Sequence, residues 1–352
     1  MLKGSRGVAS IHSDPTGTLL VSRWTCVDEV DERRGMAPKA GTSWTWPDVL
    51  DGLKTAESLF LQMGEFVLRF ESEEFGDEYE ERARLELRET PEQKKEAVAK
   101  LRELLKADPE LDVPYEEENF LLTFLRPTHF YPESAYTRMQ NFFRFKVKYP
   151  KYCSGLIPSR ERNVFEQGIL TVFPTRDHLG RRVLLIEAGK KWKPKQCTLD
   201  EIFKGVMVVL EAAISEPRTQ VSGVQVILDM DGLSLSHVWQ FTPGFAKAVV
   251  DWVQDCIPVR LKGVHIVNQP YVFNMVFAIF KPLLNAKLRN RIHFHGTDRQ
   301  SLLNHVDAKC LTTAYGGGVA IPDFPGGKLC DLLSNYDSHY ELRAQNGYTT
   351  KK

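Results

Sequence analysis

The sequence predicts an α/β fold in which helices cover a mixed, largely parallel sheet, with a helical region in front of it. From residue 168 onward, short apolar runs of strand length alternate with longer helical patterns. Such alternation is typical of parallel strands joined by crossover helices. The preceding stretch, 46–150, shows instead the 3.6-residue periodicity of amphipathic helices.

The length of 352 residues corresponds to about two domains of ordinary size. Residues 1–45 are rich in Gly, Ser, Thr and charge, and their apolar residues follow neither the helical nor the strand period, which predicts a disordered tail. We therefore expect a helical domain at 46–150, an α/β domain at 151–325 and a C-terminal extension at 326–352.

The helical domain is predicted to open with a helix that begins near Trp46 and continues through 49–62. Residues 71–118 contain 18 acidic and 8 basic residues, so this part of the chain is acidic. An apolar stripe within it predicts a further helix, and 119–150 supplies two more, separated by two prolines.

The α/β domain is predicted to begin with a hairpin formed by 168–173 and 181–187, whose connecting residues suit a tight turn. After the hairpin, helices and strands alternate. Thr242 is the expected N-cap of the middle helix, because Pro243 follows it at the first helical position. The expected helices are 201–215, 243–255 and 271–288, and the expected strands are 223–230, 261–267 and 291–295.

Composition excludes several classes of protein. The 46 Lys and Arg balance 46 Asp and Glu, which argues against a uniformly basic nucleic-acid binder. The six cysteines form no C-x-x-C pair, so we expect reduced thiols in a cytoplasmic protein and no zinc ribbon. Neither a signal-peptide core nor a myristoylation glycine occurs at the start of the sequence, and secretion or N-acylation is not expected.

One stretch has the length of a membrane span, since 263–280 contains no Asp, Glu, Lys or Arg. It nevertheless carries several polar residues and a proline. We expect it to form a strand, a turn and a helix rather than to cross a bilayer. The residues that argue against a span are His265, Asn268, Gln269, Pro270 and Asn274.

Two of the predicted helices, 201–215 and 271–288, are apolar over more than the single stripe that packing on a sheet requires. Two interpretations fit this pattern. The helices could belong to a thick core or a subunit interface, or they could wall a cavity for an apolar ligand, with 271–288 as its cover.

Basic residues are concentrated between Pro258 and Arg299, where seven occur with a single acidic residue. Arg260 and Lys262 are two apart on a predicted strand and therefore share a face. Lys287 and Arg291 are four apart and share a face if the helix extends that far. The cluster is either a solvated surface or a site for an anionic lipid headgroup.

The segment VQVILDMDGLS ends an apolar strand with Asp229 and Asp231, as in phosphatases that use one carboxylate as nucleophile and bind magnesium. A strand end with solvated acids is the alternative. The motif is short, Leu233 stands where those phosphatases have threonine, and no downstream acidic pair completes a metal site. A magnesium-dependent phosphatase is thus a competing hypothesis.

His293 and His295 alternate on one strand, and His265 precedes them on another, as zinc ligands can. Because no carboxylate accompanies them, buried and hydrogen-bonded histidines are the simpler interpretation. The sequence contains neither a G-x-S-x-G elbow nor a Gly-rich phosphate loop. We expect no metal, no cofactor and no catalytic residue.

Four segments carry a family resemblance: NFLLTFLRPTHF, TQVSGVQVILDMDGLSLSH, the long run from Phe241 to Gly296 that ends in RIHFHG, and LTTAYGGG. Together they resemble the CRAL-TRIO family, and within it the branch of the tocopherol-transfer, retinaldehyde-binding and clavesin proteins. The resemblance covers roughly residues 85–325.

This resemblance implies a three-helix module followed by a lipid-binding domain, in which a mixed sheet and its helices enclose an apolar cavity. It implies a carrier, not an enzyme, that moves one tocopherol-, retinoid- or phospholipid-like molecule between membranes. The implied partners are this ligand and anionic phosphoinositide membranes, with no nucleic acid. The implied location is the cytoplasm, with transient association to endosomal or other phosphoinositide-containing membranes.

A non-carrier adaptor that recruits a protein through 71–118 or the tail is a further alternative, and no such partner is identifiable.

The resemblance also assigns residues. The basic residues that would bind phosphoinositides are Arg260, Lys262, Lys287 and Arg291. The lid would carry Tyr271, Phe273, Val276, Phe277 and Phe280. The pocket wall would include Phe203, Val206, Leu210, Val224, Leu228, Val249, Trp252, Val253, Ile257, Val259, Leu261 and Val264.

Two departures from the family pattern bear on function. Thr128 occupies a position where the family has a basic residue, which predicts weaker headgroup binding. Val206 and Leu210 stand where the tocopherol-transfer branch has serines, so a ligand hydroxyl would lose those partners. A ligand other than vitamin E is therefore expected.

Overall fold

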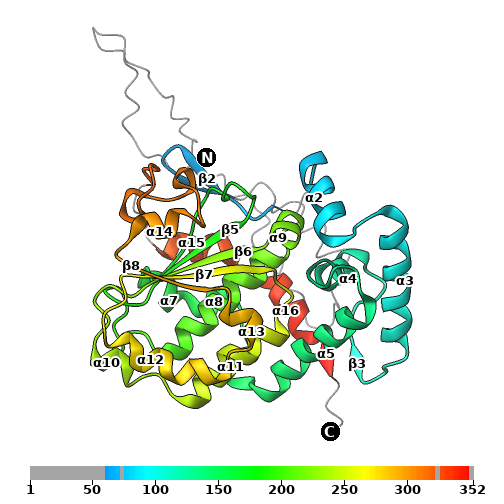
Figure 1. Cartoon of the computed structure of the whole chain (residues 1–352). Coiled ribbons are helices and arrows are strands. Elements are labelled where there is room, and N and C mark those ends of the chain that lie inside the picture. The colour runs from blue at the N-terminus through cyan, green and yellow to red at the C-terminus, as the bar shows by residue number, and fades with distance from the viewer. Residues whose placement is uncertain (1–59, 72–74, 322–325, 349–352) are drawn as a thin grey trace, which may run out of the picture. The chain divides into compact units, whose positions relative to one another are not determined.

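The computed structural model describes residues 60–71, 75–321 and 326–348 (Figure 1). The chain divides into two units, 1–43 and 44–352, and all described residues belong to the second. The predicted tail and the predicted helix start near Trp46 lie outside the described residues. The boundaries proposed for the domains stay predictions.

A five-stranded sheet forms the centre of the second unit, with the strand order β4-β5-β6-β7-β8 (Figure 1). β4 and β5 form the predicted antiparallel hairpin, and the other neighbours are parallel. The predicted mixed, largely parallel sheet is therefore confirmed. The strands are Leu170–Val172, Arg182–Glu187, Val224–Asp229, Leu261–Val267 and Ile292–Gly296.

Crossover helices join the parallel strands. Thr198 and Thr242 cap two of these helices by accepting hydrogen bonds from backbone N–H groups in the first turn, and the second of these caps was predicted. The connections are α8 (Leu199–Ile214) and α9 (Pro217–Ser222), then α10 (Leu235–Val238), α11 (Pro243–Asp251) and a π-helical turn (Trp252–Cys256), and finally α12 (Phe273–Phe280) and α13 (Ala286–Arg289).

The helix predicted at 271–288 is wrong as a continuous element. α12 ends at Phe280, a 3₁₀ turn follows at Lys281–Leu283, and α13 begins at Ala286. Pro282 explains the break, because proline cannot donate the backbone hydrogen bond that would continue the helix and its ring clashes with the preceding turn.

The helix predicted through 49–62 is also wrong at its end. Leu61 and Gln62 belong to strand β1 (Leu61–Met63), which pairs with β2 (Phe66–Leu68), while 49–59 lie outside the described residues. Gly64 supports the turn between them with a φ of 64°. The two-residue alternation that buries Leu61 and Met63 in the main core outweighs the local helical pattern.

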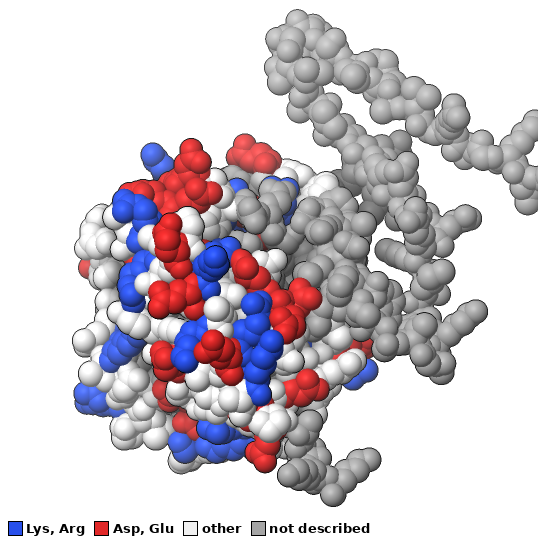
Figure 2. All heavy atoms as spheres, turned by 90° about the vertical axis from the view of Figure 1, so that its right-hand side faces the viewer, with Lys and Arg blue, Asp and Glu red and all other residues white. Residues whose placement is uncertain are grey.

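Four helices, α2 to α5, pack on one another beside the sheet. The family resemblance implies three helices here, and α2 is one more. Figure 2 shows this face with basic and acidic side chains intermingled, so the excess of acidic residues creates no region of one sign on it. The helices are Asp77–Leu87, Pro91–Lys106, Glu118–Leu125 and Pro132–Lys148.

Arg126 links the helical layer to the α/β part: it forms an ion pair with Glu89 inside the layer and a hydrogen bond with Gln220 of α9 across the contact. Arg126, from the FLR motif, donates to Glu89 at 2.8 Å and to Gln220 of α9 at 2.6 Å. The C-terminal segment adds α15 and α16, and β9 pairs with β3 of the helical layer. The remaining elements are α6 (Pro150–Cys153), α7 (Arg162–Glu166), α14 (Arg299–Leu303), α15 (Gly326–Ser334), α16 (Asp337–Gln345), β3 (Leu111–Asp112) and β9 (Gly347–Tyr348).

Alternation along the strands gives the sheet two different faces. Residues such as Leu228 and Ile266 belong to the main core, whereas their neighbours Ile227 and Val267 belong to a second core that includes Leu302 of α14. None of the helices in the described ranges combines the length and apolar character that a membrane crossing requires.

A cluster of four histidines lies at the edge of this sheet. His265, which is fully buried, has its ring nitrogens 3.0 Å from His295 and 3.1 Å from the Gln225 side chain. His295 in turn lies 2.8 Å from the hydroxyl of Ser301, and His293 stacks near His305. In the part of the chain that the structure describes, no three His, Cys, Asp or Glu side chains are placed to hold a metal ion. The geometry fits hydrogen-bonded core histidines.

Burial, reinforced by the neighbouring histidines, lowers the pKa of His265 to about 3 and that of His295 to about 4. Both values lie below the unfolded value of about 6.5. The unfolded chain therefore takes up these protons first as the pH falls, so the stabilisation is present above pH 6.5 and is lost toward pH 4.

We predict that the free energy of unfolding, measured by urea denaturation, decreases between pH 7.5 and 5.5. The slope should reach up to about 1.4 kcal/mol per pH unit for each such histidine. His265→Gln should reduce the slope, whereas His178→Gln, at an exposed position, should leave it unchanged. Equal stability of the native sequence at pH 7.5 and 5.5 would contradict this interpretation.

Candidate functional site

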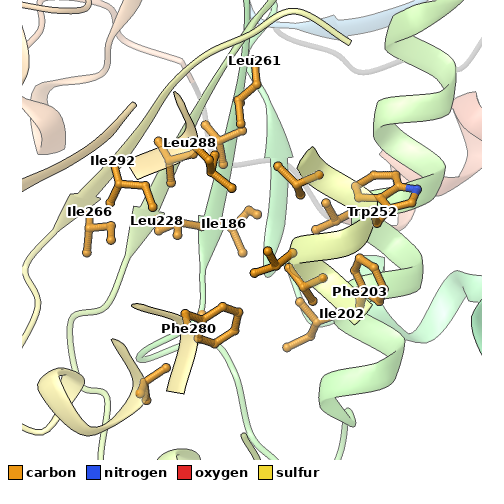
Figure 3. Close-up of a pocket in the computed structure, with 18 of the residues that line it drawn as sticks. Ile186, Ile202, Phe203, Leu228, Trp252, Leu261, Ile266, Phe280, Leu288 and Ile292 are labelled. Carbon is orange, nitrogen blue, oxygen red and sulfur yellow. The ribbon is translucent and has the colours of Figure 1, made fainter. Parts of the chain in front are cut away.

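A cavity of about 260 Å³ lies between one face of the sheet and helices α8, α11 and α12. Every residue that lines it is apolar. Figure 3 shows Ile186, Leu228 and Ile266 from three neighbouring strands on one side, Ile202 and Phe203 from α8 on another, and Phe280 from α12 across from them. This arrangement is a container with a hydrocarbon lining.

All twelve residues that the family resemblance assigns to the pocket wall line this cavity. α8 contributes Phe203, Val206 and Leu210 through successive turns of one helix face. The strands and the end of α11 with its π-helical turn contribute the others. The structure thus brings the predicted wall residues together around one space, while their contact with a ligand stays a prediction.

Sequence reasoning missed a second group of lining residues. Some could have been found: Val226 lies between Val224 and Leu228 in the two-residue alternation of β6, and Ile266 follows Val264 in β7. Others depend on long-range packing, such as Leu284 and Leu288 after the break at Pro282. The missed residues are Ile186, Ala188, Leu199, Ile202, Val226, Met230, Phe241, Phe245, Val250, Ile266, Leu284, Leu288 and Ile292.

The predicted lid residues, in α12 and just before it, divide between two surfaces. Four of them, Phe273, Val276, Phe277 and Phe280, line the cavity. Tyr271 does not line it and is 88% exposed. The helix therefore covers the cavity from one side.

The outer surface near α12 is also apolar. Met275 of α12 is 47% exposed, and Phe294, whose ring centroid lies 4.9 Å from that of Phe277, is 46% exposed. Leu235 and Trp239, from α10 and the residue after it, are 51% and 74% exposed. Large exposed apolar side chains on neighbouring elements are typical of surfaces that contact an apolar partner.

The two candidate phosphatase carboxylates have different contacts, and Asp229 fixes the chain at the start of the lid. Asp229 accepts hydrogen bonds from the side-chain amide of Asn268 at 2.9 Å and from the hydroxyl of Tyr315 at 2.8 Å. Asn268 has a φ of 53° and also accepts a hydrogen bond from Arg299. Asp231 forms an ion pair with Lys190. In this geometry Asp229 anchors the turn that leads into α12.

The cavity offers no polar partner to a ligand. Trp252 has the one side-chain nitrogen among the lining residues, and in Figure 3 it lies on the edge of the ring that faces away from the other labelled side chains. Val206 and Leu210 line the cavity with hydrocarbon. An unpaired ligand hydroxyl here would cost about 1 to 3 kcal/mol.

A basic groove of about 210 Å³ lies beside the cavity, and the two share Val253, Val259, Leu261 and Leu288 as a common wall. The groove brings together all four predicted basic residues, although Lys287 and Arg291 do not share a continuous helix. Two further residues that the prediction missed, His129 and Arg138, also line it. The lining side chains with positive charge are Arg138, Arg260, Lys262, Lys287 and Arg291.

Crowding of like charges is evident in the groove. Burial and then the charges of Arg291, Arg138 and Arg260 lower the pKa of Lys287. Burial and then Arg260 lower the pKa of Arg291 in the same way. Because such repulsion is relieved by an anion, the groove is suited to a phosphate.

Thr128, where the family has a basic residue, does not line this groove. Its hydroxyl donates a hydrogen bond to the carbonyl oxygen of Phe124 at 2.8 Å.

The sequence of this chain is similar to those of several known proteins. The CRAL/TRIO domain profile matches residues 166–317. The alpha-tocopherol transfer protein-like protein of Mus musculus is 37% identical over 237 residues, covering 67% of this chain and 68% of that protein. Its Homo sapiens counterpart is 35% identical over 237 residues, covering 67% and 69%. Clavesin-1 of Rattus norvegicus is 29% identical over 272 residues, covering 76% and 75%.

Proposed function

The chain belongs to the CRAL/TRIO family, and on this premise we propose that it is an intracellular carrier that encloses one small hydrophobic ligand and transfers it between membranes. The observation that carries the proposal is the cavity whose lining residues are all apolar, closed on one side by α12. The protein would act in the cytoplasm without chemically changing its ligand. It would associate transiently with endosomal or other phosphoinositide-containing membranes.

Hydrocarbon burial is sufficient to hold such a ligand. Burying roughly 300 to 400 Å² of apolar surface at about 25 cal/mol per Å² supplies roughly 8 to 10 kcal/mol before the costs of association. The ligand would be tocopherol-, retinoid- or phospholipid-like in size. The absence of a polar partner around Val206 and Leu210 favours a ligand whose enclosed part carries no hydroxyl.

Release would require α12 to move, because it covers the cavity. In water this movement would expose Phe273, Phe277 and other apolar side chains, which is unfavourable. Beside a bilayer the same side chains would meet lipid, and the exposed Tyr271, Met275 and Trp239 would already face it. A membrane would thus favour opening.

The basic groove supports docking on anionic membranes through phosphoinositide headgroups. Arg260, Lys262, Lys287 and Arg291 could hold phosphates by charge-assisted hydrogen bonds. Lys287 and Arg291 are the most informative to test, since neither forms an ion pair within the described ranges.

We predict that filling the cavity stops transport. Leu210→Trp should slow the transfer of NBD-labelled tocopherol, retinal and NBD-labelled phosphatidylcholine between vesicles by about tenfold or more for each probe that the native protein transfers, because the indole occupies the ligand volume. The measurement is the transfer rate followed by fluorescence.

Val147→Trp, on an exposed part of α5 that does not line the cavity, is the matched control and should transfer at the native rate. Transfer by a folded Leu210→Trp protein at the native rate would overturn the proposed container, as would a native protein that transfers none of the three probes.

We predict separately that Lys287→Glu weakens binding to vesicles containing phosphatidylinositol bisphosphate by about tenfold, since it reverses a charge in the groove. Arg289→Glu makes the same charge change on the same short helix, outside the groove, and should weaken binding by about twofold at most. Vesicle sedimentation measures both. Equal effects of the two variants would show that the groove is not the docking site.

A further inference from the structure

The positively charged residues of the groove differ in whether they have an acidic partner. Lys262 of β7 and Arg260, which directly precedes that strand, both contact Glu86 of α2, at 3.2 Å and 2.7 Å. Lys287 and Arg291 have no acidic partner within ion-pair distance in the described ranges. Two cations of the groove are therefore paired with a carboxylate, although Glu86 itself does not line the groove, and two are not.

Glu86 is held as an anion. Partial burial opposes its ionisation, but the hydrogen bond from Arg260 and the charges of Lys262 and Arg260 outweigh burial and lower its pKa. One carboxylate oxygen, Oε2, contacts both cations, as an oxygen of a bound phosphate could.

Arg138 forms no ion pair within the described ranges, although the charge of Asp255 acts on it. It reaches the groove from α5, and its guanidinium donates to the carbonyl oxygens of Ile257 at 3.1 Å and Gln254 at 3.4 Å. These bonds use one nitrogen, Nη1, and fix the plane of the group. The charge of Arg138 contributes to the lowered pKa of Lys287, so the two cations act on the same region of the groove.

Resting on the proposed docking function, we propose that the groove is a two-part phosphate site in which Glu86 occupies one part until a lipid headgroup displaces it. Arg138, Lys287 and Arg291 form the other part, which is ready for a first phosphate. A headgroup with two phosphates displaces Glu86 from Arg260 and Lys262. A headgroup with one phosphate binds the open part and leaves Glu86 in place.

This assignment gives Glu86 and Arg138 opposite effects on affinity. Displacing Glu86 breaks its contacts with Arg260 and Lys262. This free-energy cost reduces the affinity for a bisphosphate headgroup but not the affinity for a monophosphate headgroup. Arg138 contributes to binding in both cases, and it supplies from α5 a charge that the sequence lacks at Thr128.

The test measures sedimentation with phosphatidylcholine vesicles that contain either a phosphatidylinositol bisphosphate or a phosphatidylinositol monophosphate. Glu86→Gln should tighten binding to the bisphosphate vesicles by about fivefold and to the monophosphate vesicles by about twofold at most. Arg138→Met should weaken binding to both by about fivefold.

Glu80→Gln is the matched control, because Glu80 is an exposed acid on the same helix that lies outside the groove. It should leave both affinities unchanged, and thermal unfolding of each variant checks that the fold is intact. Soluble inositol 1,4,5-trisphosphate should bind the variants in the same order of affinity as the bisphosphate vesicles do, because the site binds the phosphate groups and not the bilayer.

The native protein could bind vesicles while Glu86→Gln and Glu80→Gln have equal affinities for both the bisphosphate and the monophosphate vesicles. In that case the two-part site is wrong, but the docking function stands. If the soluble headgroup binds all variants alike, the two-part site is likewise overturned. If the native protein binds neither kind of vesicle, docking and the two-part site fail together.

Discussion

The rest of the structure depends on one constraint. The cavity lined only by hydrocarbon must be shielded from water, and under the proposed function a ligand must still be able to enter it. Protein interiors are normally filled to crystal-like density, and a void forfeits the dispersion contacts of its walls. The alternation of the strands directs Leu228 and Ile266 toward this space while the other face of the sheet packs against α14. A guest molecule restores the contacts that the open space lacks.

One stretch of chain connects the cover of this space with the basic groove. It begins at Asn268, which Asp229 and Arg299 hold by hydrogen bonds, runs through α12, and continues past Pro282 to Lys287. Under the proposed function, binding of a headgroup and movement of the cover involve the same segment. The wall that the cavity and the groove share, which includes Val259 and Leu288, makes this connection short.

The sequence predicted the features that local patterns determine. The alternation of strand and helix patterns led to the correct sheet, and Thr242 was correctly predicted as a helix cap. The family resemblance led to the twelve residues now found around one cavity. The break at Pro282 was missed because the apolar pattern continues across it, and β1 was missed because its burial depends on the distant core. His129, Arg138 and Glu86 could not be assigned from the sequence, since they reach β7 from the helical layer only through tertiary packing.

The most direct test of the central claim is native mass spectrometry of the protein purified from its own cells, followed by extraction with organic solvent. The account predicts one hydrophobic adduct per chain, released by the solvent and identifiable in the extract. A folded protein that carries no adduct, and that takes up none when incubated with lipid vesicles, would contradict the account.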